Sequence, residues 1–160
     1  MCRLVVFFLL VAGFLPFSCR ADTSTLPPYP RHKGTHAPDA YQEDKARRLY
    51  ELTRRENGSL RWDDCLALKA FIRARRMVSG GYFEHRDPNT GKNPAWQMVA
   101  GCYRIRYAGE NLVKGDNTAE AMHEALMESP THRKNILNPK YDLVGIGCYD
   151  YICVQLFAGF

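Results

Sequence analysis

The chain has 160 residues, of which 46% are hydrophobic and 24% are charged, and these proportions are typical of one globular domain with a sizeable core. They exclude a disordered or fibrous chain, and no repeat of fixed period is visible. The formal net charge is +5. Because the basic residues are dispersed, and pairs such as Arg54-Arg55 and Arg75-Arg76 fall on predicted helices, we interpret them as solvated faces and expect no nucleic-acid partner.

The first 21 residues have the features of an export signal. Arg3 precedes an apolar run from Leu4 to Leu15, which is shorter than the roughly 20 residues that a membrane-spanning helix needs. Polar chain follows, and Cys19-Arg20-Ala21 places small residues at the positions that a signal peptidase recognises. We predict a signal peptide over 1–21 cleaved near Ala21, a secreted or periplasmic protein, and no transmembrane segment. The alternative is a lipoprotein acylated at Cys19.

Four cysteines remain after this cleavage: Cys65, Cys102, Cys148 and Cys153. An even number in an exported chain favours two disulfides, for which three pairings are possible. Cys148 and Cys153 flank a tetrapeptide between two strand-like runs, so a hairpin would place them opposite each other. We therefore pair Cys148 with Cys153, which leaves Cys65 with Cys102 in a crosslink that the chain-entropy model values at roughly 4 kcal/mol. A reactive catalytic thiol is the alternative for any one cysteine.

A proline-rich segment over 22–38 predicts an extended arm before a domain that spans 39–160. Capping signals and apolar spacing then predict helices over about 40–56, 64–79, 94–100, from Asn117 to 128, and 130–136. Residues 82–92 are predicted to form a loop, and 107–113 an irregular segment or short strand. In the helix over 64–79, Leu66, Ala70 and Ala74 recur at helical spacing and predict one buried stripe.

The C-terminal part predicts two strands, over 142–148 and 152–158, joined by a hairpin. With Cys148 opposite Cys153, both faces of this pair are apolar. One face carries Val144, Ile146 and Phe157, and the other carries Leu143, Ile152, Val154 and Leu156. Strands that are buried on both faces need a covering layer on each side, which predicts an α/β fold of the three-layer α-β-α sandwich type with a C-terminal antiparallel hairpin. Gly145 and Gly147 would let a helix approach the sheet closely.

Three residues in polar surroundings are candidates for a functional site. His85 lies in the loop over 82–92, Glu110 follows Gly109, and His132 lies in the first turn of the last helix. Two imidazoles and a carboxylate can bind a divalent metal such as zinc, or act as acid and base. Their spacing is not a metal-ligand signature. In the alternative interpretation, Glu110 accepts backbone hydrogen bonds in a turn and both histidines lie on the surface.

Five segments, taken in order, resemble one family. They are Leu60-Arg-Trp-Asp63, Gly81-Tyr-Phe-Glu-His85, Gly109-Glu-Asn111, Ser129-Pro-Thr-His-Arg-Lys-Asn-Ile-Leu137 and Val144-Gly-Ile-Gly147. Each alone is unspecific, but five in this order with comparable spacing are specific. Over about 42–158 the chain resembles the bacterial branch of the CAP superfamily, named for cysteine-rich secretory proteins, antigen 5 and pathogenesis-related proteins. The resemblance to these SCP domains implies an α-β-α sandwich.

The resemblance also implies a cleft lined by two histidines and two acids, which binds zinc or another divalent cation in some members. Three of these residues stand at matching positions: His85, His132 and Glu110. For the second acid, the family's animal members have a tryptophan and an acid where this chain has Leu126 and Ser129. We interpret Ser129 as a helix cap. Glu128 is a substitute for the acid, although it would point about 100° away if it is helical.

Three functions follow from these features. The resemblance favours an extracellular binding module that holds a partner protein, a lipid or an envelope component, with a divalent cation such as zinc at His85 and His132. The second hypothesis is a metal-assisted, peptidase-like hydrolase in which Glu110 acts as base toward a metal-bound water. The third is a structural secreted protein without a ligand.

Overall fold

The computed structural model describes residues 37–115 and 118–160. The predicted export signal, most of the predicted arm and Asn117 lie outside the described residues. The helices of the described part lie where the capping signals predicted them, and four strands accompany them. In chain order the elements are α1 (Ala40–Glu56), β1 (Arg61–Trp62), α2 (Asp64–Gly80), α3 (Ala95–Ala100), β2 (Tyr107–Lys114), α4 (Ala119–Glu128), α5 (Pro130–Ile136), β3 (Leu143–Tyr149) and β4 (Ile152–Gly159).

Side-chain caps fix the starts of the longer helices. Asp39 accepts a hydrogen bond from the Gln42 backbone and the Gln42 side chain accepts one from the Asp39 backbone, which completes the predicted capping box of α1. The Thr118 side chain caps α4 by accepting from the backbone N–H of Ala121. Ser129 occupies the capping position of α5, but its side chain makes no capping hydrogen bond, so the predicted role of this side chain is wrong.

The four strands form one mixed sheet in the order β1-β3-β4-β2. β3 and β4 pair antiparallel as the predicted hairpin, with Cys148 opposite Cys153. Residues 107–114 form a regular strand, β2, because every residue from Tyr107 to Lys114 has a partner on β4. β1 was not predicted. It contributes two residues, which pair parallel to the start of β3.

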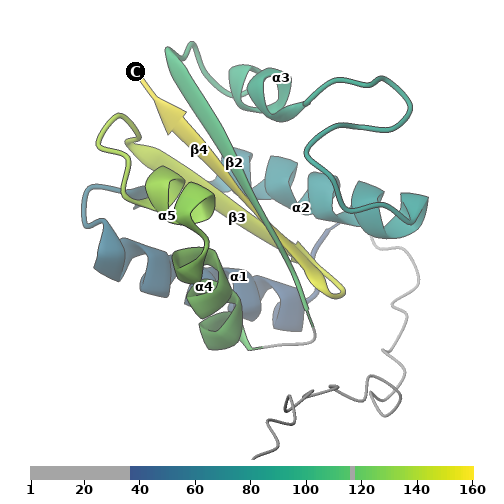
Figure 1. Cartoon of the computed structure of the whole chain (residues 1–160), viewed down its shortest axis with the longest axis horizontal. Helices are drawn as coiled ribbons and strands as arrows, with labels where there is room; N and C mark the ends of the chain where they lie inside the picture. The colour runs from purple at the N-terminus through teal and green to yellow at the C-terminus, as the bar shows by residue number, and fades with distance from the viewer. Residues whose placement is uncertain (1–36, 116–117) are drawn as a thin grey trace, which may run out of the picture.

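Helices cover both faces of this sheet, so the predicted three-layer sandwich is confirmed (Figure 1). On one face, apolar residues of α1, α4 and α5 pack against Val144, Ile146 and Phe157. On the other face, apolar residues of α2 and α3 pack against Ile152, Val154 and Leu156. Two separate apolar layers therefore enclose the hairpin, as the alternation of its side chains predicted.

Two disulfides join the predicted pairs of cysteines. Cys148 and Cys153 close the hairpin between β3 and β4. Cys65 and Cys102 link the first turn of α2 to the segment that follows α3. The second crosslink holds α3 against the same sheet face as α2, although a long polar loop separates these two helices.

The backbone of α2 lies directly on β3 at two glycines. A Cβ on Gly145 would overlap the backbone nitrogen of Ala67, and a Cβ on Gly147 would overlap the backbone nitrogen of Phe71. Moving either backbone away would cost free energy, because both the helix and the strand are held in regular hydrogen-bonded structure. The prediction that these glycines let a helix approach closely is therefore confirmed.

Gly147→Ala is expected to reduce the free energy of unfolding by at least about 2 kcal/mol, because the added methyl overpacks a contact between two backbones. Gly58→Ala is the matched control, since no atom lies within 4 Å of a Cβ at that position. Chemical denaturation of both variants measures the difference. Equal stabilities would show that α2 can move away from the sheet without cost.

Candidate functional site

Arg73 is a buried arginine on the inner face of α2, with 1% of its surface exposed. Its Nε donates to Glu110 Oε2 at 3.2 Å, and its Nη1 donates to the Tyr82 hydroxyl at 3.0 Å. Its Nη2 donates to the carbonyl oxygens of Glu84 and His85, at 2.7 and 3.1 Å. One guanidinium therefore holds both a residue of β2 and the backbone of the loop after α2.

Glu110 connects this buried cation to an exposed histidine. Its Oε1 lies 2.8 Å from His85 Nδ1, while its Oε2 accepts from Arg73. The Glu110 side chain is 1% exposed and the His85 side chain is 46% exposed. A carboxylate can only accept in this contact, so the proton of the neutral His85 ring is held at Nδ1. The Nε2 atom of His85 is left with its lone pair available to a ligand.

His132 completes a pair of imidazoles at this edge of the sheet. It lies in the first turn of α5, and its ring centroid is 6.5 Å from that of His85. Burial lowers the pKa of His132 below the ordinary 6.5, and the neighbouring His85 lowers it further. His132 is therefore neutral at neutral pH, which is the form that binds metals. The structure thus brings together His85, Glu110 and His132, the three positions that the resemblance implied.

These residues reach the site from different layers of the fold. Glu110 lies on β2, which is the edge strand beyond β4 in the described sheet. The loop that carries His85 leaves α2 on one face, and α5 with His132 lies on the other (Figure 1). The site therefore straddles the sheet edge, and Glu110 does not lie in a turn.

Arg73 was missed by the sequence-based prediction. Only the pair Arg75-Arg76 of this helix was interpreted, as a solvated face. Arg73 falls on the buried stripe, seven residues after Leu66 and four before Met77. An arginine on an apolar stripe needs a buried partner, because an unpaired charge is costly to desolvate. The place of Arg73 on the apolar stripe of α2 was therefore the feature of the sequence that could have identified it as a buried, paired residue.

Within this site, the side chains able to act as metal ligands are the two imidazoles. Both Glu110 oxygens are already engaged, so this carboxylate orients His85 as an outer partner instead of facing a ligand. The described residues contain no group of three or more His, Cys, Asp and Glu side chains able to hold a metal. Glu128 is exposed at the end of α4, and in the described part of the chain no hydrogen bond or ion pair connects it to the site. His85 and His132 are the residues that would hold a divalent cation such as zinc, since imidazole is one of its ordinary ligands.

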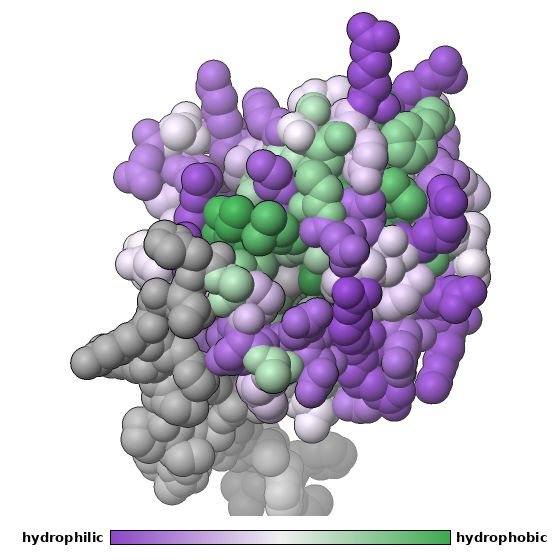
Figure 2. Space-filling view, turned by 180° about the vertical axis from the view of Figure 1, so that it is seen from behind, coloured by the Kyte–Doolittle hydropathy of each residue, from purple (hydrophilic) through white to green (hydrophobic). Residues whose placement is uncertain are grey.

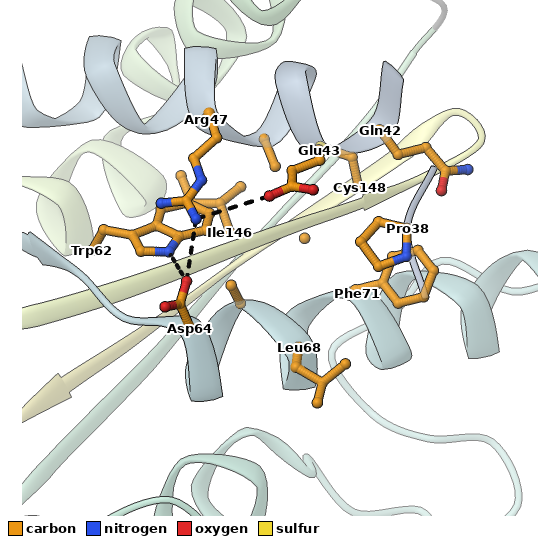
Figure 3. Close-up of a pocket in the computed structure, with 13 residues that line it drawn as sticks. Pro38, Gln42, Glu43, Arg47, Trp62, Asp64, Leu68, Phe71, Ile146 and Cys148 are labelled. Carbon is orange, nitrogen blue, oxygen red and sulfur yellow. Dashed lines mark hydrogen bonds and ion pairs between the residues drawn. The ribbon is translucent and has the colours of Figure 1, made fainter. Parts of the chain in front are cut away.

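A separate groove of about 160 Å³ lies between α1 and α2 over β3 (Figure 3). Its rim is closed by Arg47, which lies 4.0 Å from the centre of the Trp62 ring and 3.2 Å from Asp64. Seen from behind, the space-filling view shows hydrophobic residues gathered near the middle of the surface among hydrophilic ones (Figure 2). None of the residues that line the groove belongs to the two-histidine site, so this groove and the candidate chemistry lie apart.

Comparisons with known proteins agree with this fold and these motifs. The family model described as the cysteine-rich secretory protein family, CAP, matches residues 46–157. The chain is 35% identical over 131 residues to the uncharacterised protein YkwD of Bacillus subtilis, covering 78% of this chain and 51% of that one. The chain belongs to the CAP family of SCP-domain proteins.

Solved structures of bacterial proteins share the fold. An extracellular SCP-domain protein of Bacillus anthracis matches with a TM-score of 0.66 and 27% identity, over 74% of this chain and 41% of that one. An outer surface protein of Borrelia burgdorferi matches with a TM-score of 0.63 and 20% identity, over 76% of this chain and 96% of that one. The chain thus spans about half or less of YkwD and of the Bacillus anthracis protein. Across residues 37–115 and 118–160, no helix combines the length and apolar character that crossing a membrane requires.

Arg73→Met is expected to reduce the free energy of unfolding by about 3–5 kcal/mol, because it leaves the Glu110 carboxylate buried without its cation. The double variant Arg73→Met, Glu110→Leu is expected to recover most of that loss, since an apolar pair needs no counter-charge. Arg48→Met, which breaks only exposed ion pairs with Glu51 and Glu120, is the control and is expected to change little. Chemical denaturation tests all three. Equal stabilities of the Arg73→Met and Arg48→Met variants would contradict a buried charge pair.

The free energy of unfolding is expected to fall as the pH decreases below about 6.5, because the unfolded chain then binds a proton at His132 that the folded chain binds only at lower pH. Burial also lowers the pKa of His123. His132→Gln is therefore expected to make this decline shallower, and the double variant with His123→Gln shallower still. Denaturant titrations at several pH values measure the slope. An unchanged slope in His132→Gln would show that His132 is not desolvated.

Proposed function

We propose that this protein is an extracellular binding module in which His85 and His132 together hold the ligand, with a divalent cation such as zinc as the first component bound. The observation that carries the proposal is the position of Glu110 between Arg73 and His85. A buried ion pair adds little net stability over an apolar pair of similar size. Here it fixes the orientation and tautomer of an exposed imidazole, as outer partners do at metal sites.

An extracytoplasmic location is supported by three observations. The first 21 residues have the composition of an export signal. The similar structures include proteins described as extracellular and as an outer surface protein. The two disulfides are stable in an oxidising compartment. We propose an envelope component or another extracellular molecule as the partner that the site contacts.

The geometry favours binding over hydrolysis. A general base needs a free carboxylate oxygen directed at a water, and both oxygens of Glu110 are engaged by Arg73 and His85. A cation held by His85 and His132 would supply a Lewis-acidic centre for an anionic group of the partner. The chain holds the two imidazoles beside each other for that purpose.

Zinc is expected to bind the metal-free, oxidised protein at neutral pH, and binding is expected to weaken as the pH falls because protons compete for the imidazoles. The double variant His85→Ala, His132→Ala is expected to lose this binding, since no other pair of histidines is in contact in the described part of the chain. Isothermal titration calorimetry measures both proteins. His123→Ala is the matched control, because it removes a partly buried histidine from α4 and is expected to bind as the wild type does.

A wild-type protein that releases no heat with zinc, or a double variant that binds as tightly as the wild type, would overturn the proposal. Thermal denaturation of each variant without metal shows whether a loss of binding comes from a loss of fold.

A further inference from the structure

A chain of buried polar side chains crosses the core next to the candidate site. Asn111, Gln155 and Thr53 are fully buried on β2, β4 and α1. Asn111 Nδ2 donates to Gln155 Oε1 at 3.0 Å, and Gln155 Nε2 donates to Thr53 Oγ1 at 2.8 Å. Apolar side chains could fill such positions at little cost to stability, provided both partners were replaced. Packing alone therefore does not explain why these three buried positions are polar.

This polar chain ends on the helix that carries His132. Asn111 Nδ2 donates to the main-chain carbonyl of His132 at 3.1 Å. Asn111 Oδ1 accepts from Asn135 Nδ2 at 2.9 Å, and the same Nδ2 lies 3.3 Å from the carbonyl of Glu110. Both asparagines belong to the motif segments 109–111 and 129–137, and the metal-binding proposal assigns them no role. They attach α5 to β2 at the point where Glu110 holds His85.

The helix α5 depends on such attachment. It has seven residues and lacks a side-chain cap, and a helix of that length does not persist on its own in water. Glu110 and Asn111 are neighbours on a strand, so their side chains point to opposite faces. Glu110 contacts Arg73 and His85 on one face, while Asn111 contacts α5 on the other.

We propose that Asn111 and Asn135 are positioning residues that set the separation of the His85 and His132 rings. The inference rests on the proposed function, since it assumes that these two rings act together. Loss of Asn111 removes the hydrogen bond to the His132 carbonyl directly. Loss of Asn135 removes the hydrogen bond that orients the Asn111 amide and the one that ties α5 to the Glu110 carbonyl. Either loss lets the first turn of α5 move away from β2, and His132 moves away from His85 with it. The effect on a bound cation follows, because outer partners of metal ligands change affinity by about 10- to 100-fold.

The test compares Asn135→Ala with Asn57→Ala. Both residues are half-buried asparagines that donate an amide hydrogen bond involving α5. Asn57 follows α1 and donates to the carbonyl of Ile136, so its loss leaves the contacts between α5 and β2 in place. Asn111→Ala is a second variant. The first measurement is the nuclear Overhauser effect between the ring protons of His85 and His132 in metal-free, isotope-labelled protein. The second is zinc affinity by calorimetry.

We expect the Overhauser effect to be lost in Asn135→Ala and Asn111→Ala and retained in Asn57→Ala, with zinc affinity about 10- to 100-fold weaker only in the first two. Retention of the effect in Asn135→Ala would overturn the proposal, as would an equal loss in Asn57→Ala. If the wild type binds no zinc, the proposed function fails, whereas the metal-free measurement still decides the positioning role. If Asn111→Ala does not fold, Asn135→Ala decides it.

Discussion

The carboxylate of Glu110 lies almost wholly out of water, and Arg73 is the cation beside it. Desolvating a carboxylate costs several kcal/mol, which only a close counter-charge and further hydrogen bonds offset. Arg73 uses its remaining donors on Tyr82 and on the loop after α2, so the same guanidinium that neutralises the acid also fixes the path of that loop. The orientation of His85 therefore follows from a charge balance inside the fold.

The site also closes the edge of the sheet. An edge strand presents free backbone groups that invite pairing with another chain. Along β2 the Asn135 side chain donates to the carbonyl of Glu110, and the Tyr141 hydroxyl donates to the carbonyl of Ala108. Asn135 of α5 and Tyr141 thus occupy the open side of this strand. Asn135 therefore contributes both to covering the edge of the sheet and to attaching the helix that carries His132.

Most elements of the fold could be predicted from short-range patterns in the sequence. Helix caps, the alternation of apolar residues in the hairpin and the spacing of the cysteines are short-range patterns, and the structure has the corresponding elements. β1 has only two residues, too few for any pattern to register. Arg73 was not predicted, because its burial depends on Glu110 and Tyr82, whose proximity no local pattern shows. That His85 and His132 would meet depended on the family resemblance, since nothing in their spacing along the chain requires it.

The sheet order has a consequence for the time at which the domain can fold. β1 pairs with residues about 80 positions later, and the hydrogen bond from Gln155 to Thr53 spans 102 positions. α1 and α2 both pack on β3 and β4, which come from the end of the chain. Contacts so distant in sequence slow folding, because the loop must close before any of them forms. During synthesis, the first hundred residues therefore have no sheet to cover, and the core can assemble only once the last strand has emerged.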